Sequence, residues 1–309
     1  MDEAEKLTFK FLKPFIENTN TLQKDFEMKE SKKCDLLNTY NNYSHFINAI
    51  SRILFERKSN ILHKQATIFT TNYDLFIEKA FEKFSDVLIL NDGFKRTPAL
   101  HCKFKFSSSE YFNVIYNTGN LYNYQVQIPS VNLIKLHGSL NWQKEEDKSI
   151  IHSLSYLDRA STLRKEIESN KSSEDTGKIS EFNNLFSIIL PKKDKLKESL
   201  LNQIYYDLLR IYANELDKEN TLLIAEGFSF ADEHILDITK RALKNPTLKL
   251  IIFCYDKEPT NYQSIFSSFN NVDIVYSSKK NINFKKFNDL LSQIASSDTD
   301  TLRDPENEK

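Results

Sequence analysis

Short apolar runs alternate along this chain with segments in which apolar residues recur at helical spacing. Four of the runs are strand-like, and the first of them, residues 66–70, has the β-branched and aromatic character of a strand buried on both faces. They span residues 66–70, 131–136, 221–225 and 248–254. Each run stops abruptly at polar or glycine-containing residues, and residues 76–84 then follow with helical spacing. This alternation predicts an α/β fold with a mainly parallel sheet.

The remaining pattern predicts further elements and three regions. We expect two helices within residues 1–60, weaker strands at 87–90 and 187–191, an aromatic hairpin within 94–130, a charged helical pair with a serine-rich hinge at 156–186, a long amphipathic helix at 196–216, a last strand at 272–276 and a last helix at 284–294. The predicted regions are an N-terminal helical segment (1–60), an α/β domain (61–296) with insertions at about 94–130 and 156–186, and a disordered polar tail (297–309).

The polar residues that follow the first two strand-like runs are the first candidates for a site. Residues 71–74 read Thr-Asn-Tyr-Asp, and residues 137–139 read His-Gly-Ser. In open α/β sheets, ligands bind at the carboxyl ends of the strands, so Asn72 and Asp74 are expected to project into a crevice. The alternative is structural, because Asn and Asp are also ordinary turn and helix-capping residues.

Four motifs together resemble a known family. TTNYD at 70–74, KLHGS at 135–139, EGFSFADEHI at 226–235 and FCYD at 253–256 occur in this order and at these separations. They resemble the Sir2-like domain of bacterial antiphage defence proteins, most of all the Sir2 subunits that assemble with a HerA-type hexameric ATPase. The resemblance covers about residues 60 to 290. It implies a Rossmann-like three-layer fold with a helical insertion, and NAD as substrate.

The resemblance assigns catalysis to Asn72 and His137. An asparagine amide offers two donors and an acceptor, which can fix a water molecule or a ribose hydroxyl without adding charge. An imidazole, with an unperturbed pKa of about 6.5, can accept the proton of an attacking water near neutral pH. Asp74 is expected either to favour the developing cation or to cap the following helix. The implied reaction is hydrolysis of NAD to ADP-ribose and nicotinamide, activated within a complex.

Other motif residues are expected to hold the nucleotide. Thr71, Gly138 and Ser139 flank the two catalytic candidates, and Gly227 and Ser229 are placed to receive the adenosine half. Tyr255 is expected to stack on adenine and Asp256 to reach the adenosine ribose, although a turn-forming role for Asp256 remains open. The family also has a glycine-rich G-A-G-x-S turn upstream of the asparagine motif. Here the first glycine is Gly93, so we expect an amino-terminally shortened member.

Composition excludes several classes of protein. Cys34, Cys102 and Cys254 form no C-x-x-C pair, which is typical of a reduced cytoplasmic protein, and the four-cysteine zinc site of protein-deacetylating sirtuins cannot be built. No two of the 6 histidines have a metal-ligand spacing, so no metal is expected. The formal net charge of −1 gives no reason to expect nonspecific nucleic-acid binding, so we expect contact with nucleic acid only indirectly, through a partner.

The sequence leaves alternatives for function and partners. We expect no membrane span, a homo-oligomer with the 156–186 insertion as one contact, and a HerA-type ATPase as partner. A scaffold subunit that binds NAD or ADP-ribose without turnover is the main alternative, favoured by the missing glycine-rich turn. A nuclease or nucleic-acid-binding role would need an acidic metal cluster or a basic groove, and the sequence indicates neither.

Overall fold

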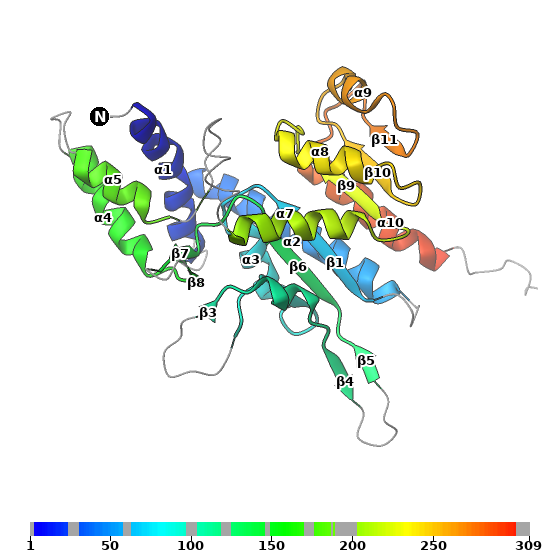
Figure 1. Ribbon diagram of the computed structural model, residues 1–309, viewed down its shortest axis with the longest axis horizontal. Coiled ribbons are helices and arrows are strands. Elements are labelled where there is room, and N and C mark those ends of the chain that lie inside the picture. The colour runs from blue at the N-terminus through cyan, green and yellow to red at the C-terminus, as the bar shows by residue number, and fades with distance from the viewer. Residues whose placement is uncertain are drawn as a thin grey trace, which may run out of the picture. The chain divides into compact units, whose positions relative to one another are not determined.

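The computed structural model of the chain describes residues 3–23, 31–57, 63–96, 104–118, 125–145, 149–169, 176–186, 188 and 203–300 (Figure 1). The chain divides into two compact units. Unit 1 comprises Met1–Ile47 and Arg57–Tyr206, and unit 2 comprises Asn48–Glu56 and Asp207–Lys309. Each unit contains its own parallel sheet, so the chain is an α/β protein, as its strand and helix pattern predicts.

Unit 1 is built around a parallel sheet in which β6 lies between β1 and β2. A second sheet pairs β8 antiparallel with β3 and β7, and β4 and β5 form an antiparallel hairpin. The elements are α1 (Glu3–Gln23), the part of α2 (Ser31–Glu56) up to Ile47, β1 (Gln65–Thr70), α3 (Phe76–Phe81), η1 (Glu82–Phe84), β2 (Ile89–Asn91), β3 (Phe104–Lys105), η2 (Ser108–Phe112), β4 (Tyr116–Thr118), β5 (Gln125–Gln127), β6 (Ser130–Lys135), β7 (Trp142–Lys144), β8 (Ile150–His152), α4 (Tyr156–Ser169) and α5 (Thr176–Asn184).

The two strands that carry the catalytic candidates differ in burial. Every residue of β6 is buried, as expected for a central strand. Every residue of β1 is only half-buried, so the expectation that this strand is buried on both faces is wrong. The physical reason is position, because within the part of the chain described here β1 pairs on one side only, with β6.

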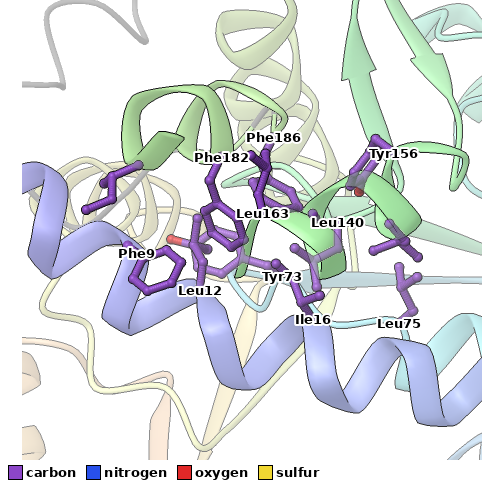
Figure 2. Close-up of a cluster of buried hydrophobic side chains, with 13 residues drawn as sticks. Phe9, Leu12, Ile16, Tyr73, Leu75, Leu140, Tyr156, Leu163, Phe182 and Phe186 are labelled. Atoms are coloured by element: carbon purple, nitrogen blue, oxygen red, sulfur yellow. The ribbon is translucent and has the colours of Figure 1, made fainter. Parts of the chain in front are cut away.

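A hydrophobic cluster in unit 1 joins three helices to the loops at the sheet edge (Figure 2). Helices α1, α4 and α5 contribute apolar side chains at helical spacing, which is why these segments fold as helices that bury one face. The loops contribute Tyr73, Leu75 and Leu140. The cluster consists of Phe9, Leu12, Ile16, Tyr73, Leu75, Leu140, Tyr156, Leu157, Ala160, Leu163, Ile179, Phe182 and Phe186. The helical insertion thus packs directly against the candidate site.

Unit 2 contains a parallel sheet with β10 between β9 and β11. Its elements are most of α7 (Gln203–Leu216), β9 (Leu222–Glu226), α8 (Glu233–Ala242), β10 (Lys249–Phe253), α9 (Thr260–Phe266), β11 (Val272–Val275) and α10 (Phe284–Asp300). Asp232 begins α8 by accepting hydrogen bonds from the backbone N–H groups of His234 and Ile235. This cap satisfies two donors that have no partner within the helix.

The structure confirms the four main strands, with ends shifted by at most one residue. The predicted strand at 187–191 is described only at Ile188, which forms an isolated antiparallel bridge with Gly138. The predicted helix at 196–216 is described from Gln203, and helix α10 continues to Asp300, into the predicted tail. Residues 301–309, the Ser172-Ser173 hinge and Cys102 lie outside the described residues. The predicted domain boundaries do not coincide with the two units and stay a prediction.

Candidate functional site

Strands β1 and β6 bring Asn72 and His137 to the same edge of the sheet. The strands are parallel, and their last residues, Thr70 and Lys135, are register partners. Asn72 and His137 each follow two residues later. The Leu136 N–H donates to the Thr70 carbonyl oxygen at 2.9 Å, and the Leu140 N–H donates to the Tyr73 carbonyl oxygen at 3.0 Å. The two loops therefore run side by side beyond the strands.

Asn72 and Tyr73 point in different directions from the first loop. The Asn72 residue is exposed, and its backbone N–H donates to the Thr70 hydroxyl at 3.0 Å. Tyr73 is buried, with ring centroids 6.0 Å from Phe11 and 6.1 Å from Phe15 of α1. Burial, with a smaller contribution from Tyr205, raises the pKa of Tyr73 to about 12. Tyr73 is therefore a neutral anchor that leaves the Asn72 amide on the solvent side.

The second loop depends on a glycine. Gly138 has a φ of +85°, a left-handed conformation that residues with a Cβ rarely adopt. Its N–H donates to the Lys135 carbonyl oxygen at 3.2 Å, which closes a tight turn directly after β6. This turn leaves His137 half-buried, with access to solvent. Gly138 itself is buried, and its predicted contact with NAD stays a prediction.

Ser139 lies below the site surface. The residue is fully buried, and its hydroxyl accepts from Lys135 Nζ at 3.0 Å while lying 3.4 Å from the Tyr73 carbonyl oxygen, to which it donates. These contacts connect the two loops to each other. They favour a supporting role for Ser139 over the nucleotide contact that the sequence suggests.

Asp74 occupies the capping role that is one of its two predicted roles. Its carboxylate accepts a hydrogen bond at 3.2 Å from the N–H of Phe76, the first residue of α3. The residue at the N-cap position is Leu75, one residue later than predicted, and its side chain makes no capping bond. Thr71 and Asp74 are both half-buried, so neither is closed off from solvent.

A buried ion pair that the sequence pattern does not predict lies beneath the two loops. Lys135 Nζ lies 2.8 Å from Glu78 Oε1 of α3, with side-chain exposures of 3% and 18%. The same ammonium donates to the Asp74 carbonyl oxygen and to Ser139 Oγ. Burial raises the pKa of Glu78, and the attraction of Lys135 opposes this shift only in part. The only indication in the sequence was a charged residue at the end of an apolar strand.

Unit 2 brings together the residues that are expected to bind the adenosine half. Strands β9 and β10 are parallel, with Glu226 opposite Phe253 at their ends. Gly227 and Ser229 follow β9, Tyr255 and Asp256 follow β10, and all four are exposed at the carboxyl edge of this sheet. Gly227 has a φ of +63°. That these residues share one crevice with Asn72 and His137 stays a prediction.

The loop after β9 is held by its own contacts. The Ala231 N–H donates to Ser229 Oγ at 3.4 Å, and the Tyr262 hydroxyl donates to the Phe228 carbonyl oxygen at 3.2 Å. Burial raises the pKa of Glu226, which is the last residue of β9. The sequence pattern predicts no role for Glu226. A carboxylate at a strand end gives no indication of burial until the sheet is known.

Three further findings bear on the class of the protein. Within the described residues, no three His, Cys, Asp or Glu side chains are grouped so that they could hold a metal ion. None of the helices in the described ranges combines the length and the apolar character that crossing a membrane requires. Cys254 is buried in unit 2, as expected of a core thiol.

Comparison with protein families decides the classification. Residues 66–275 match the family model of the SIR2-like domain. The chain belongs to the SIR2-like family. The matched range begins in β1 and ends with β11, so it includes all four motif-bearing loops. No curated protein matches the sequence. Membership assigns this SIR2-like chain an NAD-related function. Its candidate active site is the edge of the sheet at the carboxyl ends of β1 and β6.

Proposed function

We propose that this SIR2-like protein is an NAD glycohydrolase subunit that cleaves NAD to ADP-ribose and nicotinamide during antiphage defence. The observation that carries the proposal is the parallel pairing of β1 with β6. Because Thr70 and Lys135 are register partners, Asn72 and His137 lie at equivalent positions, two residues beyond the ends of their strands. Asn72 is exposed, and His137 is half-buried. Family membership supplies NAD as the compound to which such a site belongs.

The residues present fit a hydrolysis that needs few groups. The bond between the nicotinamide nitrogen and the ribose carbon breaks, its electron pair leaves with neutral nicotinamide, and a bond from water oxygen to that carbon forms. Asn72 orients the water or a ribose hydroxyl through its amide, and His137 accepts the proton that the water loses. The water supplies the new hydroxyl group of ADP-ribose, so no further reactant is required.

The finer features of the proposal rest on resemblance. We propose a Rossmann-like three-layer arrangement, a cytoplasmic location, a homo-oligomer and activation within a complex with a HerA-type hexameric ATPase. Gly227, Ser229, Tyr255 and Asp256 would hold the adenosine half, because they are exposed together at the carboxyl edge of the second parallel sheet.

The direct test measures NAD, nicotinamide and ADP-ribose by chromatography after incubation with the intact chain and a co-expressed HerA-type ATPase. Asn72→Ala and His137→Ala are each expected to abolish turnover without lowering the thermal midpoint, because neither side chain belongs to the core. Asn41→Ala and His45→Ala, at exposed positions of α2, are matched controls that should retain turnover. Equal NAD consumption by the Asn72→Ala/His137→Ala double variant and the unmodified complex would refute the assignment.

A second candidate is a subunit that binds NAD or ADP-ribose without cleaving it. The observation that favours it is the absence of any glycine before Gly93, because backbone approaches a pyrophosphate most closely at glycine. Calorimetric titration separates the two functions. Binding of NAD with no nicotinamide released, in the presence of the ATPase partner, supports the scaffold, whereas Asn72-dependent release of nicotinamide excludes it.

A further inference from the structure

The Lys135 ammonium joins three separate segments beneath the candidate active site. It contacts the Asp74 carbonyl oxygen in the turn after β1, Ser139 Oγ at 3.0 Å in the loop after β6, and Glu78 Oε1 at 2.8 Å on α3. An ammonium has three donors, so these three acceptors use all of them. The first two acceptors lie within two residues of Asn72 and His137, respectively.

The ion pair is a costly way to stabilise the fold. Both charged groups are largely removed from water, and Glu78 Oε2 is buried without a hydrogen-bond partner. Burial raises the pKa of Glu78 despite the neighbouring Lys135, so the attraction between the two charges does not offset the loss of hydration. Buried ion pairs of this kind are often replaceable by apolar side chains without loss of stability. What an apolar replacement cannot provide is directional contact with both loops.

The backbone contacts between the loops are few. Leu136 donates to Thr70 and Leu140 donates to Tyr73, and between these two bonds lie His137 on one loop and Asn72 on the other. Lys135 adds a cross-connection next to the bond between Leu140 and Tyr73, because the Asp74 carbonyl oxygen and the Ser139 hydroxyl meet at its Nζ. Charge-assisted hydrogen bonds of this kind are about twice as strong as neutral ones.

We propose that Lys135 is a positioning residue that fixes the turn carrying Asn72 against the loop carrying His137. It acts through the Asp74 carbonyl oxygen and the Ser139 hydroxyl and does not itself touch the nucleotide. The proposal rests on the proposed function, since the amide and the imidazole must keep a set separation to act on one ribose. A residue that holds reacting groups in place affects the rate of the chemical step more than the affinity for substrate.

Three variants separate positioning from simple stabilisation. Lys135→Met leaves Glu78 buried without its partner and is expected to lower the thermal midpoint. Lys135→Met/Glu78→Met removes both charges and is expected to recover it, because Met is flexible and fills buried space. Glu78→Gln is the matched control, because it keeps Lys135 and its contacts to both loops. A stabilising role predicts that the double variant recovers turnover together with stability.

Positioning predicts the opposite for turnover. In the complex with the ATPase, the double variant should have a kcat for NAD lowered about 100-fold, with KM changed far less, while Glu78→Gln stays within a few-fold of the unmodified protein. Recovery of both the thermal midpoint and kcat in the double variant would overturn the proposal. So would a loss of kcat in Glu78→Gln as large as that in the double variant.

Amide hydrogen exchange provides a readout that does not depend on NAD cleavage. The Leu136 and Leu140 amides report the two bonds between the loops, and the Leu250 amide in β10 is an internal control. In the double variant the two loop amides should exchange about tenfold faster or more, with Leu250 unchanged. Unchanged exchange at Leu136 and Leu140 would refute the positioning role. If the complex releases no nicotinamide at all, the proposed function fails, and the exchange result still decides the role of Lys135.

Ser139→Ala covers the case in which the double variant does not fold. It removes one acceptor of Lys135, together with the weaker 3.4 Å bond from the Ser139 hydroxyl to the Tyr73 carbonyl oxygen, and leaves the pair with Glu78 intact. Faster exchange at Leu140 with an unchanged thermal midpoint supports the proposal. Exchange equal to that of the unmodified protein overturns it.

Discussion

Thr70 and Lys135 lie opposite each other as the last residues of two parallel strands, and each is followed two positions later by a candidate catalytic residue. The relationship is a consequence of parallel pairing, because parallel strands end at the same edge of a sheet. It explains how residues 65 positions apart in the chain, such as Thr70 and Lys135, support one site.

Gly138→Ala should disturb the loop that carries His137. An added Cβ at a φ of +85° costs about 1–2 kcal/mol, and relief of this strain moves the turn that holds the imidazole. We expect a destabilisation of that size, measured by urea unfolding, and a loss of NAD turnover. Gly177→Ala is the control, because an added Cβ there meets nothing within 4 Å, and Ala favours the helix α5. Full turnover in Gly138→Ala would contradict the prediction.

Phe182→Ala should destabilise unit 1 and weaken the support of the Asn72 loop. Phe182 is fully buried, 4.8 Å from Phe9 and 5.5 Å from Phe186 between ring centroids. Truncating a buried aromatic side chain costs about 3–5 kcal/mol. Phe112→Ala is the matched control, since Phe112 is 64% exposed and its loss should change the free energy of unfolding by less than about 0.5 kcal/mol. Equal effects of the two variants would argue against the cluster in Figure 2.

His152→Phe should make the protein less sensitive to acid. The His152 ring packs against Phe94 and Phe104, with ring centroids 5.5 Å and 6.4 Å apart, respectively. Burial is the main cause that lowers the pKa of His152. Of the charges that act on it, Asp92 raises the pKa and Arg96 lowers it. A lowered pKa means that the folded state favours neutral imidazole. The neutral imidazole therefore contributes to the free energy of unfolding in full above the pKa of the unfolded state, about 6.5. This contribution to stability is lost as the pH falls through the lower pKa of the folded state.

The measurement for His152 is urea unfolding from pH 8 to pH 5. The unmodified protein should lose stability towards pH 5, and His152→Phe should lose less over the same range. Parallel curves for the two proteins would show that His152 does not carry the effect.

Tyr255→Ala should raise the KM for NAD and leave the fold unchanged. Tyr255 is 57% exposed at the end of β10, so its ring contributes little to the core. Stacking of a base on an aromatic ring contributes about 1–3 kcal/mol, which corresponds to an increase in KM of roughly fivefold or more. Tyr206→Ala, at a residue that is 54% exposed on α7, is the control and should not change KM. An unchanged KM in Tyr255→Ala would remove Tyr255 from the site.

The residues of the candidate site that could be predicted from the sequence are those that follow from the local pattern of apolar and polar positions. Apolar runs that end at TTNYD and KLHGS mark strand ends, and the parallel rule then places Asn72 and His137 at one edge. The missed residues depend on contacts between distant segments. Lys135 ends an apolar run, where a solvated lysine is expected, and its burial follows from α3 and the Asp74 turn closing over it. Tyr73 turns inward because α1, far away in the sequence, supplies Phe11 and Phe15.

Helix α1 has a practical consequence for any shortened form of this protein. Phe9, Leu12 and Ile16 share one core with Tyr73, Leu75 and Leu140, the residues on which the two loops rest (Figure 2). A chain trimmed to start at residue 61 would keep every residue of the family match and still lose three of the side chains that fill this core. Expression work on the isolated domain should therefore retain the first helix, and inactivity of a trimmed chain would say nothing about Asn72 or His137.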